Sequence, residues 1–259
     1  MFQRMLASAL IAGIAAGLIA ALLHFAFVQK FILLGEQYET GALIHFGGSG
    51  PKEGEHSHEA APTTADPAAE NPTAPATAAD GHDHDHGASA QGSAATRNAL
   101  TVVFMVILYV SYGFLLVAGF GIAEAFGRKI GPTEGILWGI AGFAVFHLSP
   151  ALGLAPELPG TIAAKLDLRQ IWWWATVVCT GTGLALLAYG RHWIALPLAA
   201  ALLALPHVIG APQGEGYFGL APTEVGAIFA ARVLGTAMVV WACLGWFAGA
   251  VWAREGARS

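Results

Sequence analysis

The chain has 259 residues, 56% of them hydrophobic and only 11% charged, and its formal net charge at pH 7 is −5. A soluble protein of this length needs a far more polar surface, so the composition excludes an ordinary soluble domain. The apolar residues form long blocks, and we expect the partner of these blocks to be a lipid bilayer rather than a nucleic acid.

Six apolar segments are candidate membrane crossings, each of which takes about 20 mostly apolar residues. They cover residues 5–28, 100–126, 136–155, 171–189, 193–209 and 225–252. The sequence therefore predicts an all-α integral membrane protein, a bundle of six transmembrane helices. The fourth and fifth segments are short and only Gly190, Arg191 and His192 separate them, so a five-helix arrangement stays open.

The domain organisation follows from these segments. We expect a first transmembrane helix (1–34), an acidic His-rich loop (35–99), the remaining helical bundle (100–254) and a short tail (255–259). The loop holds 10 of the 17 acidic residues. Its middle is an Ala/Pro/Thr tract that cannot bury enough apolar surface to offset the entropy of ordering, so we expect the loop to be disordered.

Basic residues in the short connections predict the orientation, because cytoplasmic loops are rich in Lys and Arg. With six helices, one side of the membrane carries Arg4, Arg128, Lys129, Arg191, Arg254 and Arg258. That side is expected to be the cytoplasm, with both termini there, and the His-rich loop is then extracytoplasmic. Lys165 and Arg169 oppose this assignment. We expect the inner (plasma) membrane of a cell as the location.

Three histidines, His24, His147 and His207, lie inside apolar segments, where ionisable side chains are costly and mark ion or substrate pathways. All three come late in segments that run outward, so they would share the outer half of the membrane. We expect them to be metal ligands on a transport path.

Prolines adjoin two of these histidines. Pro150 and Pro206 lack an amide hydrogen, which removes the usual helical partner of the Phe146 and Leu202 carbonyl groups. Such carbonyls beside imidazoles offer mixed oxygen and nitrogen ligands to a divalent transition metal, and broken helices are common in transporters. The alternative is that both prolines only kink their helices.

Small residues precede His24. Ala9, Gly13, Gly17 and Ala21 repeat every four residues, which is typical of closely packed membrane helices. His24 lies on the same helical face and is expected to face protein rather than lipid. It is therefore either a metal ligand or a packing residue.

Two further charges fall within apolar segments. Glu124 lies near the inner end of the second segment, where it could be an exit ligand, a proton-coupled site or an interfacial residue. Arg232 is too cationic to line a metal site and is expected to pair with Glu224 or Glu215.

The loop carries alternating histidines and carboxylates on a flexible chain, which can fold several imidazoles around one ion. We expect metal capture by His56, His58, His82, Asp83, His84, Asp85 and His86. Because an unstructured site of this kind follows the Irving-Williams order, it can collect a metal but cannot select cobalt.

Three stretches carry a family resemblance: the opening MFQRMLASALIAGIAAGLIAALLH, FHLSPALGLAPELPG from Phe146 to Gly160, and LPHVIGAP from Leu205 to Pro212. They resemble the CbtA family of proposed cobalt transporter subunits. The resemblance implies import of Co²⁺ for cobalamin synthesis, together with CbtB, a small partner with one membrane helix and its own His-rich end. The family is usually described with five helices rather than six.

These observations predict the membrane subunit of a divalent metal-ion importer and not an enzyme. Co²⁺, or Ni²⁺, would be the transported ion, and we expect no tightly bound cofactor. Two alternatives stay open: a membrane-anchored metal sensor or chaperone, in which the loop is the functional part, and a haem-binding membrane protein with intramembrane histidines as axial ligands.

Overall fold

The computed structural model describes residues 1–45, 93–214, 216 and 218–257. The histidines and carboxylates that we expect to capture metal in the loop, His56 to His86, lie outside these residues, as does Arg258. Within the described part the protein is all-α, as predicted, and its only strand-like pairing is an isolated bridge between Thr161 and Gly219.

Six helical rods correspond to the six predicted segments. The first consists of α1 (Phe2–Leu23), the π-helical turn η1 (His24–Val28) and α2 (Gln29–Glu39). The third consists of α4 (Pro132–Phe143), the π-helical turn η2 (Ala144–Leu148) and α5 (Ser149–Ala151). The others are α3 (Ala94–Ala125), α6 (Leu166–Tyr189), α7 (Ala195–Ile209) and α8 (Thr223–Gly256).

The first helix continues past residue 34, where we expected the loop to begin, and ends at Glu39. Polar residues such as Gln29, Lys30 and Glu36 end the apolar window without ending the helix, because Gln, Lys and Glu are good helix formers. Gly35 is buried against Leu158 and Pro159, so tertiary packing also holds this extension.

Four of the six rods are long and apolar enough to cross a membrane: residues 2–39, 94–125, 166–189 and 223–256. The rod at residues 132–151 is about 30 Å long and α7 only about 22 Å, at 1.5 Å per residue. A hydrocarbon core is about 30 Å thick, so α7 is shorter than that core. The bundle thus keeps six apolar helices, and the two outside the four candidate spans are the rod at residues 132–151, which carries His147, and α7, which carries His207.

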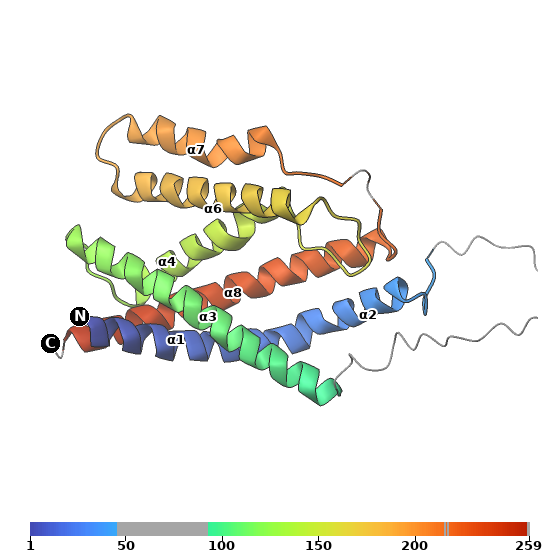
Figure 1. The fold of residues 1–259 in the computed structure, drawn as a ribbon. Coiled ribbons are helices and arrows are strands. Elements are labelled where there is room, and N and C mark those ends of the chain that lie inside the picture. The colour runs from blue at the N-terminus through green and yellow to red at the C-terminus, as the bar shows by residue number, and fades with distance from the viewer. Residues whose placement is uncertain (46–92, 215, 217, 258–259) are drawn as a thin grey trace, which may run out of the picture.

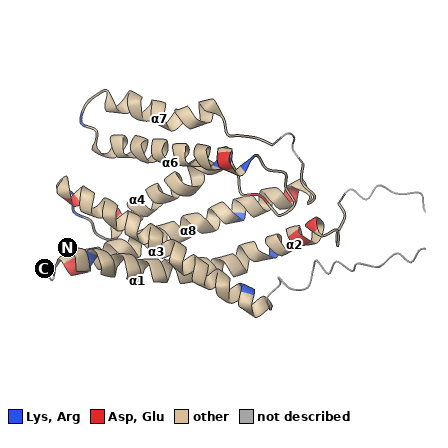
Figure 2. Cartoon of the chain, in the orientation of Figure 1, with Lys and Arg blue, Asp and Glu red and all other residues tan. Residues whose placement is uncertain are grey.

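The connections and chain ends gather at two ends of the bundle (Figure 1). The terminal end holds both termini and the connections α3–α4 and α6–α7. The loop end holds the end of α2, the start of α3, the connection between α5 and α6 (152–165) and that between α7 and α8 (210–222). Helices α1, α3, α4 and α8 pack around one core, and α6 and α7 form a hairpin beside them. Most charged residues lie towards the two ends (Figure 2).

The predicted small-residue ridge is confirmed. Ala9, Gly13, Gly17 and Ala21 are all buried, and they let α1 approach the backbone of α3 closely. A Cβ atom added at Gly13 would lie 2.8 Å from the Val110 amide nitrogen, closer than real Cβ contacts allow. A second ridge joins α4 to α8: a Cβ at Gly135 would lie 3.1 Å from Cα of Gly249.

We expect Gly13→Ala to lower the stability of the purified protein, because the added methyl group meets backbone atoms that cannot move independently. Overpacking of this kind costs about 1–3 kcal/mol. Gly235→Ala is the matched control on α8, since nothing lies within 4 Å of its added Cβ, and a slightly higher stability is expected there. Thermal melting of both variants in detergent checks this; equal melting temperatures would contradict the close approach of α1 to α3.

Candidate functional site

A cavity of about 800 Å³ lies at the loop end, and we call it the loop-end cavity. Its walls come from η2 and α5, the 152–165 connection, the start of α6 and the part of α8 from Phe229 to Leu234. Its polar lining consists mainly of His147, Glu157, Thr161, Arg169 and Gln170. The cavity therefore joins a histidine of an apolar helix to the end of the bundle at which α2 ends and α3 begins.

His147 is held by its π-helical turn and by Trp241. In η2 the Ser149 amide donates to the Ala144 carbonyl, five residues back, and Pro150 supplies no amide hydrogen. Our expectation for the Phe146 carbonyl assumed α-helical hydrogen bonds between residues four apart. That hydrogen-bond pattern does not hold in this turn. Trp241 Nε1 donates to His147 Nδ1 at 3.2 Å. Turns of π-helix occur often at functional sites.

The hydrogen bond from Trp241 determines what His147 can bind. A neutral imidazole that accepts at Nδ1 carries its proton on Nε2, so neither nitrogen has a free lone pair in this conformation. A metal ion can take Nδ1 only when the indole bond opens. The indole of Trp241 thus occupies the nitrogen lone pair that a ligand of His147 would need.

A carboxylate lines the same cavity as His147. Glu157 accepts a hydrogen bond from Arg169 at 3.1 Å, and both side chains are about one third exposed. This ion pair leaves Glu157 with further lone pairs for a cation. Sequence reasoning did not single out Glu157, although it lies within the distinctive stretch from Phe146 to Gly160; Trp241 gave no signal, because it is one of many aromatic residues in apolar segments.

His207 lies in a different environment. Its Nε2 shares a hydrogen bond of 3.2 Å with Ser149 Oγ, which shares another of 2.8 Å with Thr180 Oγ1. The chain of polar groups ties α7 to α5 and α6. Pro206 lies inside α7, which continues to Ile209, and Trp172 Nε1 donates to its carbonyl at 3.1 Å. His207 does not line the loop-end cavity.

His24 opens the π-helical turn η1 and is half-buried. Its ring lies edge-on to Phe25, with 5.7 Å between ring centroids. Like His207, it does not line the loop-end cavity. Two of the three intramembrane histidines, His24 and His147, therefore lie in π-helical turns, which the sequence pattern did not predict.

The three histidines do not form a metal cluster. Among the described residues no group of three or more His, Cys, Asp or Glu side chains is arranged to hold a metal ion. A cation at His147 would have that imidazole, the Glu157 side of the cavity and water as its surroundings.

Glu124 lies at the terminal end in an ion pair with Arg4. The two guanidinium contacts measure 2.8 and 3.0 Å, and Trp252 Nε1 donates to the same carboxylate at 2.8 Å. Arg4 also donates to the Trp252 carbonyl and lies over the indole ring. These contacts join α1, α3 and α8, so Glu124 is engaged in holding the helices together.

Arg232 does not pair with Glu224 among the described residues, and Glu215, the other expected partner, lies outside them. Its guanidinium lies 5.1 Å from the centroid of the Phe31 ring, and the ion pairs among the described residues are Arg4–Glu124, Arg97–Glu36 and Arg169–Glu157. Glu224 instead accepts from the Thr223 hydroxyl. A guanidinium over an aromatic face is a favourable arrangement that needs no carboxylate.

A family model described as "Probable cobalt transporter subunit (CbtA)" matches residues 2–253 of the chain. No curated protein and no solved structure matches. The matched region contains the loop-end cavity, all three intramembrane histidines and both glycine-lined helix contacts.

We expect Glu124→Gln to destabilise the protein by about 1–3 kcal/mol, because hydrogen bonds to a charged group are lost from a partly buried cluster. The Arg4 and Glu124 side chains are only 19% and 29% exposed. Glu36→Gln is the matched control, since its pair with Arg97 is 3.6 Å long with side chains 51% and 43% exposed, and such pairs contribute about 0–1 kcal/mol. Melting in detergent compares the two; a larger loss for Glu36→Gln would sink this assignment.

Proposed function

Because the chain belongs to the CbtA family of probable cobalt transporter subunits, we propose that it takes up Co²⁺ through the loop-end cavity and transfers it at His147. The observation that carries the proposal is the position of His147, an imidazole within an apolar helix that lines a cavity reaching the loop end of the bundle. Intramembrane ionisable residues that line cavities mark ion pathways.

The capture step belongs to the His-rich loop in this proposal. The loop adjoins the same end of the bundle as the cavity, since α2 ends and α3 begins there. Imidazole and carboxylate groups on a flexible chain raise the local concentration of divalent cations. Glu157 would then be the first fixed carboxylate that the ion meets in the cavity.

The transfer step requires His147 to exchange its partner. The ion displaces the Trp241 indole from Nδ1, and the indole hydrogen bond re-forms when the ion leaves. Because a neutral hydrogen bond of this kind is worth about 1 kcal/mol net, the exchange weakens binding only moderately and favours release. In this scheme His147 is the transfer ligand, whereas His207 ties α7 to α5 and α6 and His24 has no assigned part.

The proposed orientation places the terminal end in the cytoplasm of an inner membrane. The described connections and termini there carry Arg4, Arg128, Lys129, Arg191 and Arg254, as expected for the cytoplasmic side. Inward movement of a divalent cation would then gain about 4.6 kcal/mol per 100 mV of membrane potential. The subunit description implies a partner, and we propose a small His-rich protein with a single membrane helix.

We expect His147→Ala to lower the initial rate of Co²⁺ uptake at least about tenfold, the scale on which metal sites respond to loss of a supporting group. Radiolabelled Co²⁺ uptake into cells that make the chain and its small partner measures this, normalised to the amount of protein in the membrane. His192→Ala, an exposed histidine of the α6–α7 connection, is the control and keeps the full rate.

Two further variants separate the steps. Trp241→Phe removes the competing hydrogen bond and is expected to tighten the apparent affinity for Co²⁺ about fivefold. Deletion of residues 50–90 is expected to lower uptake only at low Co²⁺. Full uptake by His147→Ala together with no uptake by the loop deletion would contradict the permease mechanism and favour a membrane-anchored metal sensor or chaperone.

A further inference from the structure

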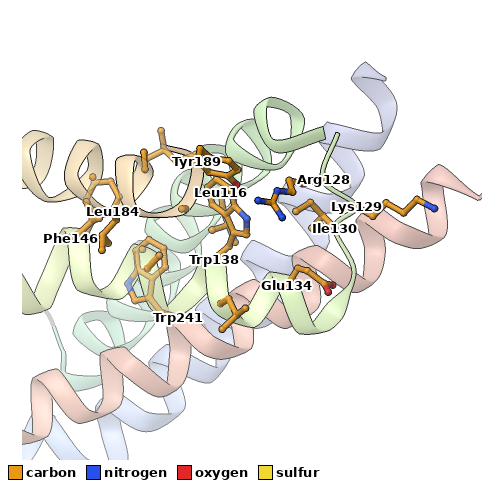
Figure 3. Close-up of a pocket in the computed structure, with 18 of the residues that line it drawn as sticks. Leu116, Arg128, Lys129, Ile130, Glu134, Trp138, Phe146, Leu184, Tyr189 and Trp241 are labelled. Atoms are coloured by element: carbon orange, nitrogen blue, oxygen red, sulfur yellow. The ribbon is translucent and has the colours of Figure 1, made fainter. Parts of the chain in front are cut away.

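A second cavity, of about 760 Å³, opens at the terminal end, and we call it the terminal-end cavity. It lies over α4 between α3 and α6, and Figure 3 shows the side chains that line it. Within the described residues α3 packs chiefly on α1, and α6 packs chiefly on α7, so little of either helix fills the space between them. Among the described residues to which the proposed cobalt pathway assigns a part, Trp241 alone lines this cavity.

The lining changes from basic to apolar along the cavity. Arg128 and Lys129 lie at its terminal-end mouth, the walls include Leu116, Leu137 and Leu184, and the inner end is formed by aromatic side chains including Phe146 and Trp241 (Figure 3). The rings of Phe146 and Trp241 stack 5.7 Å apart and close that end. The cavity is therefore amphipathic from one end to the other.

The chain turn at the end of α3 brings the two basic residues to the mouth. Gly127 has a φ of +79°, a conformation that favours glycine, and it follows directly on the last turn of α3. Arg128 then lies 5.9 Å from the centroid of the Tyr189 ring. In the described part of the chain no carboxylate forms an ion pair with either Arg128 or Lys129.

A single carboxylate, Glu134, is among the lining residues, and it already accepts a hydrogen bond of 3.0 Å from the Gly131 amide. The two neighbouring cations therefore outweigh it, and the mouth carries net positive charge. This charge repels a divalent cation, so the cavity is unsuited to be the exit of a Co²⁺ path. It attracts an anion.

The length of the cavity fits a lipid chain. Along α4 and η2 it extends from Glu134 to Phe146, which is about 18 Å at the rise of an α-helix. One leaflet of a bilayer contributes about half of a 30 Å hydrocarbon core. A small water-soluble anion would use the mouth but leave the apolar walls bare, whereas a phospholipid uses both.

We propose that the terminal-end cavity is a binding site for an anionic phospholipid. The phosphate lies between Arg128 and Lys129, and one acyl chain runs between α3 and α6 towards Phe146. Basic pockets between membrane helices bind anionic headgroups in this way. The bound chain would fill the space between α3 and α6, so the lipid would stabilise the hairpin against the core.

The test uses the full chain, purified in a nonionic detergent, stripped of lipid and then titrated with dioleoyl phosphatidylglycerol or dioleoyl phosphatidylcholine. Native mass spectrometry measures the dissociation constant of the first bound lipid. For two basic contacts we expect about a thirtyfold preference for phosphatidylglycerol. Arg128→Gln with Lys129→Gln removes the preference, whereas Arg191→Gln, at the same end but outside the lining, retains it.

A second pair of variants tests the acyl chain. Ala185→Phe fills the cavity from α6 and is expected to weaken binding of both lipids, whereas Leu187→Phe, which does not line it, is expected to leave binding unchanged.

Equal affinity of the wild-type chain for the two lipids would overturn the proposal. So would stabilisation by inorganic phosphate as large as by phosphatidylglycerol, because the site would then be a phosphate site and not a lipid site. Each single variant, Arg128→Gln and Lys129→Gln, gives a partial loss of preference and serves if the double variant does not fold.

Discussion

The hydrogen bond from Trp241 to His147 is the contact on which the functional site depends, and it depends in turn on how closely α4 and α8 pack. The indole of Trp241 occupies the space beside Gly142, where an added Cβ would overlap the ring. Gly135 and Gly139 bring the two backbones together in the preceding turns. Without these glycines the helices would separate, and the indole would not reach the imidazole 3.2 Å away. The glycines that let α4 and α8 pack closely thus also position the Trp241 indole beside His147.

Phe146 separates two cavities of opposite character. It lines both the loop-end cavity and the terminal-end cavity, and its ring stacks on Trp241. On one side are His147 and Glu157, which suit a cation; on the other are Arg128 and Lys129, which suit an anion. Trp241 is the hydrogen-bond partner of His147, and with Phe146 it also closes the terminal-end cavity. A ligand at His147 and a lipid in the terminal-end cavity would therefore both act on the contact between α4 and α8.

The helices, their order and the small-residue ridge of α1 could be predicted, because apolar periodicity and glycine spacing are local properties of the sequence. The partners of polar side chains could not. Glu124 is bound by Arg4, which precedes it by 120 residues, and Arg232 lies over the ring of Phe31. The two π-helical turns also could not be predicted from the local sequence. Pro150 suggested a break in the helix, yet the helix continues, with a hydrogen bond from the Ser149 amide to the carbonyl five residues back. The expectation that His24, His147 and His207 share the outer half of the membrane concerned their depth, and depth does not determine which way a side chain faces.

The most direct test of the proposed site is the ligand environment of Co²⁺ on the purified chain lacking residues 50–90, measured by X-ray absorption at the cobalt K-edge. We expect an imidazole nitrogen in a shell otherwise made of oxygen atoms, and we expect the imidazole contribution to disappear in His147→Ala. A spectrum equal to that of hydrated Co²⁺, or one that His147→Ala leaves unchanged, would contradict transfer at His147.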